Sequence, residues 1–223
     1  MSESSICVLA SGNRGKLVEL SDALEPHNIR LVPQSEYDVT DADETAVTFV
    51  ENALIKARHA SLATGLPALA DDSGLVVPVL AGAPGIYSAR YADLGTDTGQ
   101  KPTDADNMQK LLHELRNYSG TDRAARFVCV LAFLQHANDP EPIIAIGHWS
   151  GRIADTIEGD GGFGYDPIFF CPQTGATAAA MGKQKKQAIS HRAAAITHLQ
   201  QQLSKQSAQT QTQTQTQQQS TPN

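Results

Sequence analysis

Apolar and polar positions along the chain follow the pattern of an α/β protein. Residues 6–10 form a short apolar run that predicts a strand, and Leu17, Leu20 and Leu24 then recur at helical spacing. A second apolar run follows at 29–32. A strand, a helix and a second strand in this order predict a β-loop-α-β unit, and therefore the α/β class.

Three further helices are indicated by spacing and by end signals. Thr48 and Glu51 have the spacing of a capping box in front of an apolar helical face, and Gly65 predicts the end of that helix. Apolar residues also recur at helical spacing over 108–115 and again over 189–203. The last of these segments predicts a helix close to the C-terminus.

Strand signals lie between these helices. Residues 75–80 predict a strand directly after the acidic motif Asp71-Asp72-Ser73-Gly74. Residues 127–134 and 143–149 predict two long strands, and the Asn138-Asp139-Pro140 turn between them predicts a hairpin. The chain therefore has enough predicted strands for one sizeable sheet.

The C-terminal segment has a different composition from the rest of the chain. After Lys205 it consists mainly of Gln and Thr, which cannot bury enough apolar surface to offset the entropy of ordering. We therefore predict one domain over 1–205, with two lobes that share a core, and a disordered tail over 206–223.

Composition and charge exclude several classes of partner. Hydrophobic residues make up 40% of the 223 residues, which is enough for a packed interior, and the net charge of −7 disfavours nucleic acid and anionic membranes. No apolar stretch has the length of a membrane span, and the N-terminal residues lack a secretory pattern, so we expect the cytoplasm. The widely spaced cysteines, expected to be buried thiols, are Cys7, Cys129 and Cys171.

The first candidate site lies where the first strand meets the first helix. Glycines allow a backbone to approach a ligand closely, N–H groups at a helix start attract anions, and a lysine adds positive charge. The residues of this loop are Ser11, Gly12, Asn13, Arg14, Gly15 and Lys16. The spacing is not that of a P-loop, and a glycine-rich turn with a solvated lysine remains an equal alternative.

Acidic residues form a second group of candidates. Neighbouring carboxylates in the Asp71-Asp72-Ser73-Gly74 motif can point in different directions, so that one meets a metal while the other orients neighbouring groups. Oxygen ligands of this kind suit Mg²⁺. Glu44 lies in an acidic stretch just before the second helix, and Lys56, which shares a face of that helix with Asn52, could reach a phosphate. Taken alone, these residues also fit an acidic turn and a solvated helix face.

Two further motifs resemble parts of a binding pocket rather than of a core. A glycine-rich stretch presents two aromatic rings and an acid, which suits stacking and hydrogen bonding. Its residues are Phe163, Gly164, Tyr165 and Asp166. Lys186 precedes Ser190-His191-Arg192 at a predicted helix start, where His191 and Arg192 offer planar donors to purine acceptors.

Taken together and in this order, the motifs resemble the Ham1-like family of inosine triphosphate pyrophosphatases, which act on non-canonical purine nucleotides such as dITP and XTP. The matching stretches are 11–19, 44–60, 70–75, 82–91, 127–131, 161–170 and 188–192. The resemblance implies an elongated mixed β-sheet with flanking helices, two lobes around a central nucleotide cleft, and a homodimer. Ser11 replaces a threonine that is common in the family, with the hydroxyl retained.

The resemblance also implies roles for single residues. Asp72 would accept a proton from water, and Glu44 and Asp72 would hold Mg²⁺. The residues implied to contact the substrate are Ser11, Gly12, Asn13, Arg14, Gly15, Lys16, Lys56, Ser73, Phe163, Gly164, Tyr165, Asp166, Lys186, His191 and Arg192. Lys183 and Lys185 are alternatives to Lys186, which is selected by its distance from Ser190-His191-Arg192.

The predicted reaction is the hydrolysis of ITP, dITP or XTP to a monophosphate and diphosphate. Water would attack the α-phosphorus, and Mg²⁺ with Lys16 and Lys56 would balance the charge of the leaving diphosphate. Arg192 can only donate hydrogen bonds, which favours a 6-oxo purine over adenine. A pyrophosphatase for modified pyrimidine nucleotides and a nucleotide-binding module without catalysis remain as alternatives.

Overall fold

The computed structural model describes residues 4–94 and 101–219, and the side chains of Arg14 and 209–219 are outside that description. Within the described residues, seven strands form one sheet in the order β2-β1-β3-β4-β5-β6-β7. The strands are β1 Ser5–Leu9, β2 Ile29–Pro33, β3 Ala68–Val76, β4 Ala124–Leu134, β5 Ile143–Ile153, β6 Phe169–Cys171 and β7 Ala176–Thr177. Both neighbours of β1 are parallel to it and the other pairs are antiparallel, so the sheet is mixed, as predicted.

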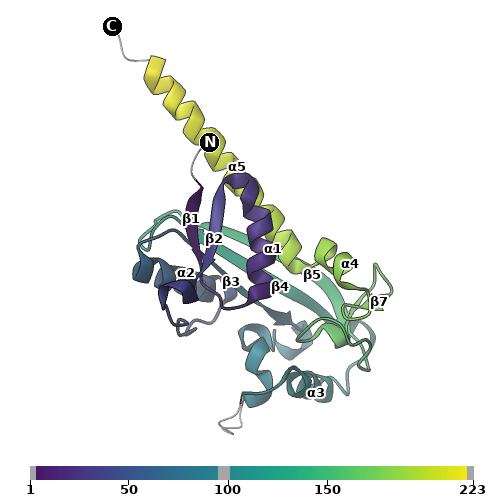
Figure 1. Cartoon of the computed structure of the whole chain (residues 1–223). Coiled ribbons are helices and arrows are strands. Elements are labelled where there is room, and N and C mark those ends of the chain that lie inside the picture. The colour runs from purple at the N-terminus through teal and green to yellow at the C-terminus, as the bar shows by residue number, and fades with distance from the viewer. Residues whose placement is uncertain (1–3, 95–100, 220–223) are drawn as a thin grey trace.

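Helices cover both faces of the first half of this sheet (Figure 1). The helices are α1 Arg14–Leu24, α2 Phe49–Thr64, α3 Asp104–Glu114, α4 Lys183–Ile189 and α5 His191–Gln219. Leucines of α1 and α5 pack on one face of the sheet, and alanines of α2 pack on the other. The Thr48 hydroxyl caps α2 at Glu51, and Gly65 ends α2 with a positive φ, as the sequence predicts.

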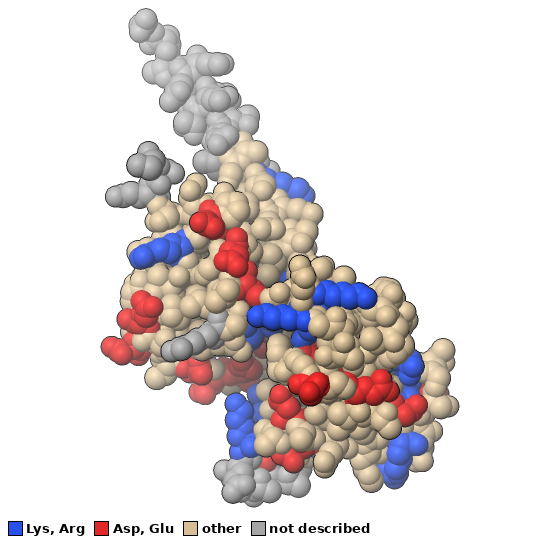
Figure 2. Space-filling model, turned by 45° about the vertical axis from the view of Figure 1, so that its right-hand side comes forward, with Lys and Arg blue, Asp and Glu red and all other residues tan. Residues whose placement is uncertain are grey.

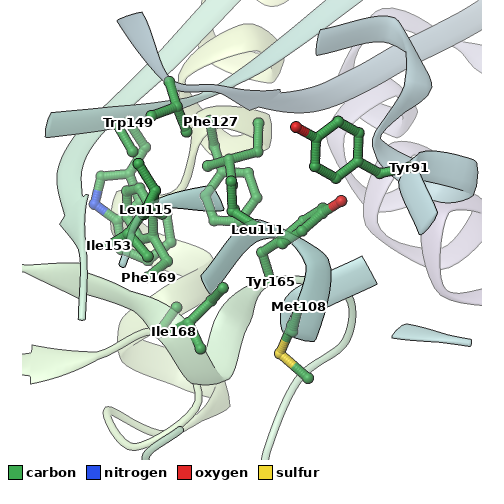
Figure 3. Close-up of a cluster of buried hydrophobic side chains, with 14 of the residues drawn as sticks. Tyr91, Met108, Leu111, Leu115, Phe127, Trp149, Ile153, Tyr165, Ile168 and Phe169 are labelled. Carbon is green, nitrogen blue, oxygen red and sulfur yellow. The ribbon is translucent and has the colours of Figure 1, made fainter. Parts of the chain in front are cut away.

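The second lobe is built on the far ends of the two longest strands. β4 and β5 pair over ten residues and extend past the first cluster of side chains into a second one. There Phe127 and Trp149 pack with Phe169, and with residues of α3 and of the short helix Gly85–Asp93 (Figure 3). The predicted hairpin is thus the element that joins the two lobes.

The strand that carries the acidic motif differs from the prediction. We expect a strand over 75–80 that begins after the motif, but β3 runs from Ala68 to Val76 and includes the motif. β4 lies alongside, with Asp71 opposite Leu131 and Gly74 opposite Val128, so hydrogen bonds between strands satisfy this backbone. Residues 78–80 instead form a short 3-10 turn that begins at Pro78.

The backbone of the C-terminal segment is helical. We expect a disordered tail from residue 206, whereas the backbone of α5 continues as a helix to Gln219 and beyond the edge of the sheet (Figure 1). A helix already held by packed residues such as Leu199 and Leu203 extends at low cost, because elongation avoids the cost of nucleation and each further residue adds a hydrogen bond. The division into a domain and a tail stays a prediction.

The helices within residues 4–94 and 101–219 include none with the length and hydropathy of a membrane span.

Candidate active site

The site lies at the point where the sheet topology changes direction. β1 pairs with β2 on one side and β3 on the other, and the two connections cross opposite faces of the sheet through α1 and α2. Such a switch leaves a crevice beyond the carboxyl ends of the strands, where ligands bind in open α/β sheets. β1 stops at Leu9 while β3 continues to Val76, so the side chains of β3 beyond Leu69 border this crevice.

A cavity of about 210 Å³, here called the loop cavity, occupies the crevice. Its lining residues are Ala10, Ser11, Gly12, Lys16, Gln34, Asp41, Ala42, Glu44, Lys56 and Asp71. Two N–H groups that we expect to face an anion, those of Gly15 and Lys16, donate instead to the Asn13 side chain, because asparagine is a favoured helix cap. Positive charge therefore comes from Lys16 and Lys56. Arg14 is also predicted to contact the substrate, but its side chain lies outside the part of the chain that the structure describes.

Asp71 belongs to the α1 and α5 side of the sheet. Its carboxylate accepts hydrogen bonds from Lys16 Nζ at 2.8 Å and from Ser73 Oγ at 3.0 Å, and Arg192 Nη2 lies 4.0 Å away. Burial raises the pKa of Asp71, but the charges of Lys16 and Arg192 outweigh it and lower the pKa to about 2. Asp71 is therefore a permanently ionised carboxylate at the centre of the site.

Asp72 belongs to the α2 side. Lys56 Nζ lies 2.8 Å from Asp72 Oδ1 and 2.8 Å from Glu44 Oε1, so the ammonium bridges the two carboxylates. Burial raises the pKa of Asp72, and the neighbouring carboxylates of Glu44 and Asp71 add to the rise, although Lys56 opposes it. A raised pKa brings Asp72 closer to the range in which a carboxylate accepts a proton efficiently.

The pair of Glu44 and Asp72 fits the predicted magnesium ion. Asp72 Oδ2 is buried and has no hydrogen-bond partner, and the two carboxylates already share one cation, Lys56. Among the described residues no group of three or more His, Cys, Asp or Glu is arranged to hold a metal ion. Mg²⁺ usually takes only one or two carboxylates and completes its shell with water and substrate phosphates, so two oxygen donors are sufficient.

A second cavity of about 170 Å³, here called the aromatic cavity, lies next to the first and shares Lys16 with it. Its lining residues are Lys16, Ser73, Gly74, Leu75, Ser88, Ala89, Asp104, Phe127, Phe163, Gly164, Tyr165, Asp166, Lys186, His191 and Arg192. On the face seen in Figure 2, basic and acidic side chains are interspersed over the middle of the molecule. The two cavities bring together residues that are up to 182 positions apart, from Ala10 to Arg192.

The exposed ring of Phe163 contacts the cationic side chains of Lys186 and Arg192. Lys186 Nζ lies 4.4 Å from the ring centroid and also pairs with the buried carboxylate of Asp166. Asp166 accepts a hydrogen bond from Phe163 N at 2.9 Å, so one acid orients both the lysine and the loop. Phe163 itself is 58% exposed, which leaves its ring available for stacking.

His191 and Arg192 also line the aromatic cavity, and each is buried with one nitrogen that has no hydrogen-bond partner. These atoms are His191 Nδ1 and Arg192 Nε, and buried polar atoms of this kind are costly unless a ligand or water binds them. The His191 ring stacks on Phe127 with centroids 4.8 Å apart. Burial, together with the charges of Arg192 and Lys186, lowers the pKa of His191 to about 3, so the ring is neutral.

Two residues predicted to contact the substrate, Tyr165 and Gly164, form hydrogen bonds within the protein, and one residue that was not predicted, Glu19, lies at the site. The Tyr165 hydroxyl donates to the Ser88 carbonyl at 2.9 Å, and Tyr165 packs in the second-lobe core as well as lining the aromatic cavity. Gly164 N donates to Asp104 at 2.6 Å. The sequence analysis did not select Glu19, whose carboxylate lies 3.4 Å from Arg192. Glu19 is three positions after Lys16 on α1, so the two residues share a helix face, and this spacing could have indicated it.

This fold and this site define an α/β protein with a charged cleft at a topological switch point. Residues 7–202 match the model of the Ham1 family, and the chain belongs to that family, as its motifs indicate. It is 54% identical over 189 residues to a dITP/XTP pyrophosphatase of Salmonella paratyphi A, which covers 85% of this chain and 93% of the relative. A dITP/XTP pyrophosphatase of Vibrio parahaemolyticus is 50% identical over 202 residues, 91% of this chain and 98% of the relative. A solved HAM1 protein from Coxiella burnetii has a TM-score of 0.83 and 48% identity, and the match covers 90% of this chain and 99% of that one.

Proposed function

We propose that this chain hydrolyses non-canonical purine nucleoside triphosphates, namely ITP, dITP and XTP, to the monophosphate and diphosphate. The names of its relatives support this substrate class. The observation that carries the proposal is the contact of Lys56 with both Glu44 and Asp72, beside a cavity that also contains Lys16. A triphosphate in the loop cavity would lie beside both cations.

The reaction requires water to attack the α-phosphorus in line with the departing diphosphate. Asp72 orients that water and accepts its proton, and the burial that raises the pKa of Asp72 makes it a better base. Lys16 and Lys56 balance the charge that develops on the diphosphate. Asp71 takes no part in proton transfer, because its low pKa makes it a poor proton acceptor.

Magnesium dependence is part of the proposal. Glu44 and Asp72 would hold the ion, and Lys56 would then be free to turn from the carboxylates toward the phosphates. When bound, Mg²⁺ polarises phosphate oxygens and stabilises transition-state charge as a Lewis acid. The family resemblance further implies a homodimer, which light scattering on the purified chain would test.

The aromatic cavity suits the base. Phe163 offers a face for stacking, and Arg192 donates hydrogen bonds without being able to accept any. A 6-oxo purine matches such donors, whereas the 6-amino group of adenine would oppose them. Guanine also has a 6-oxo group, so the rejection of GTP requires a further interaction that disfavours its 2-amino group.

Product identification from ITP tests the proposal. We expect IMP and diphosphate in equal amounts, since attack at the α-phosphorus cannot release single phosphates. Release of orthophosphate would place the attack at a different phosphorus atom and contradict the proposed site. A substrate panel with modified pyrimidine nucleotides, measured with and without Mg²⁺, distinguishes the alternative pyrophosphatase and a nucleotide-binding module without catalysis.

A further inference from the structure

One buried carboxylate connects the two cavities of the site. Asp71 Oδ1 accepts a hydrogen bond from Lys16 Nζ at 2.8 Å, and Asp71 Oδ2 lies 4.0 Å from Arg192 Nη2. Asp71 and Lys16 line the loop cavity, and Lys16 and Arg192 line the aromatic cavity. The row Lys16, Asp71, Arg192 therefore runs from the proposed phosphate end to the proposed base end.

Arg192 is shared between two acids. Its Nη1 lies 3.4 Å from Glu19 on α1, and its Nη2 lies 4.0 Å from Asp71 on β3. The side chains of Asp71 and Arg192 are 1% and 9% exposed, so solvent and salt screen this attraction little. The position of the guanidinium consequently depends on how strongly each carboxylate is already neutralised by other cations.

We propose that Asp71 is a positioning residue that couples the occupation of the loop cavity by phosphates to the position of Arg192 in the aromatic cavity. The inference rests on the proposed function, since it assumes a triphosphate in one cavity and a base in the other. Phosphates in the loop cavity attract the Lys16 ammonium and weaken its bond to Asp71. The Asp71 carboxylate then attracts Arg192 more strongly, away from Glu19, and holds its donors against the base.

This coupling has a measurable consequence for selectivity. The protein should distinguish hypoxanthine from adenine more strongly in triphosphates than in monophosphates. The reason is that only the longer phosphate chain reaches Lys16 fully. We therefore compare two affinity ratios, that of ITP to ATP and that of IMP to AMP. Isothermal titration in EDTA measures all four affinities without turnover. In the unaltered protein the triphosphate ratio should exceed the monophosphate ratio about fivefold or more, as is typical for coupling between sites.

Three substitutions separate this role from a structural one. Lys16→Met should make the two ratios equal by raising the monophosphate ratio, because Asp71 then attracts Arg192 even without phosphates, and this variant keeps the test informative if Asp71→Asn does not fold. Asp71→Asn should lower the triphosphate ratio to the monophosphate ratio. Glu19→Gln should act in the opposite direction and raise the monophosphate ratio, because Arg192 then has only Asp71 left among its two acidic partners. Lys205→Ala, a change at an exposed lysine of α5 that lines neither cavity, should leave both ratios unaltered.

The outcomes are distinct from a failure of the proposed function. Equal ratios in the unaltered protein, or an unaltered difference between them in both Asp71→Asn and Lys16→Met, would overturn the inference. A protein that releases no diphosphate from ITP in Mg²⁺ would instead contradict the proposed hydrolysis, and the titrations in EDTA do not depend on that result.

Discussion

Asp71 and Asp72 are neighbours in β3, yet their side chains serve opposite faces of the sheet. Asp71 contacts Lys16 of α1 and approaches Arg192 of α5, whereas Asp72 contacts Lys56 of α2. Alternation along a strand makes this separation unavoidable. The two acids consequently differ in electrostatics: the pKa of Asp71 is lowered to about 2, and that of Asp72 is raised.

Asp72→Asn should nearly abolish turnover of ITP while binding is retained. The amide keeps the shape of the side chain but cannot accept a proton, and a general base contributes about 10²–10⁴-fold to rate. Steady-state kinetics, together with titration of ITP in EDTA, separates the two effects. A variant that turns over at close to the normal rate would show that another group accepts the proton.

Arg192→Ala should reduce the preference for ITP over ATP. A hydrogen bond to a charged group is worth about 1.5–3 kcal/mol, which corresponds to about a ten- to hundredfold change in the ratio of kcat/KM values. Lys185→Ala is the matched control, because this exposed lysine on α4 does not line the aromatic cavity. Unchanged selectivity in Arg192→Ala would mean that the base is recognised elsewhere.

Removal of Mg²⁺ with EDTA should stop hydrolysis of ITP, and added Mg²⁺ should restore it. Glu44→Gln should raise the Mg²⁺ concentration needed for half-maximal rate by about tenfold or more, because one of only two carboxylate ligands is lost. Magnesium titrations of the rate measure this shift. The same Mg²⁺ requirement in Glu44→Gln and in the unaltered protein would remove Glu44 from the proposed metal site.

His191 should make the folded protein less stable in mild acid. Its folded pKa is about 3 and its ordinary value is 6.5, so between these values the unfolded chain binds more protons and stability falls as the pH decreases. From pH 7 to pH 5 the loss should be about 2 kcal/mol of unfolding free energy. His191→Phe, which keeps an aromatic ring beside Phe127, should remove this loss in urea titrations; an equally steep pH dependence in that variant would contradict the prediction.

Gly147→Ala should destabilise the fold because α5 packs directly on β5. A Cβ atom at Gly147 would lie 2.0 Å from the His191 carbonyl oxygen and 2.4 Å from Ala195 N, and neither backbone group can move alone. We expect a loss of about 3 kcal/mol or more in urea unfolding, at the upper end of overpacking effects. Gly12→Ala is the control, since a Cβ there meets nothing within 4 Å. Equal stability of the two variants would show that α5 adjusts freely.

Local signals in the sequence were sufficient to predict several elements and the residue types that line the candidate site. Helical spacing and the Thr48 cap predicted α2, and the turn at Asn138 predicted the hairpin of β4 and β5, because these signals act over a few residues. The motifs also indicated the Ham1 family and pointed to lysines and carboxylates that lie in contact in the structure.

How those residues meet follows from strand pairing and packing. Pairing with β4 placed the acidic motif inside β3, and the resulting alternation gave Asp71 and Asp72 different faces and different partners. The fold also brought the Tyr165 hydroxyl to the Ser88 carbonyl and Glu19 to Arg192. Such outcomes depend on contacts between residues far apart in the chain, and burial then sets their charges, so no local pattern could specify them.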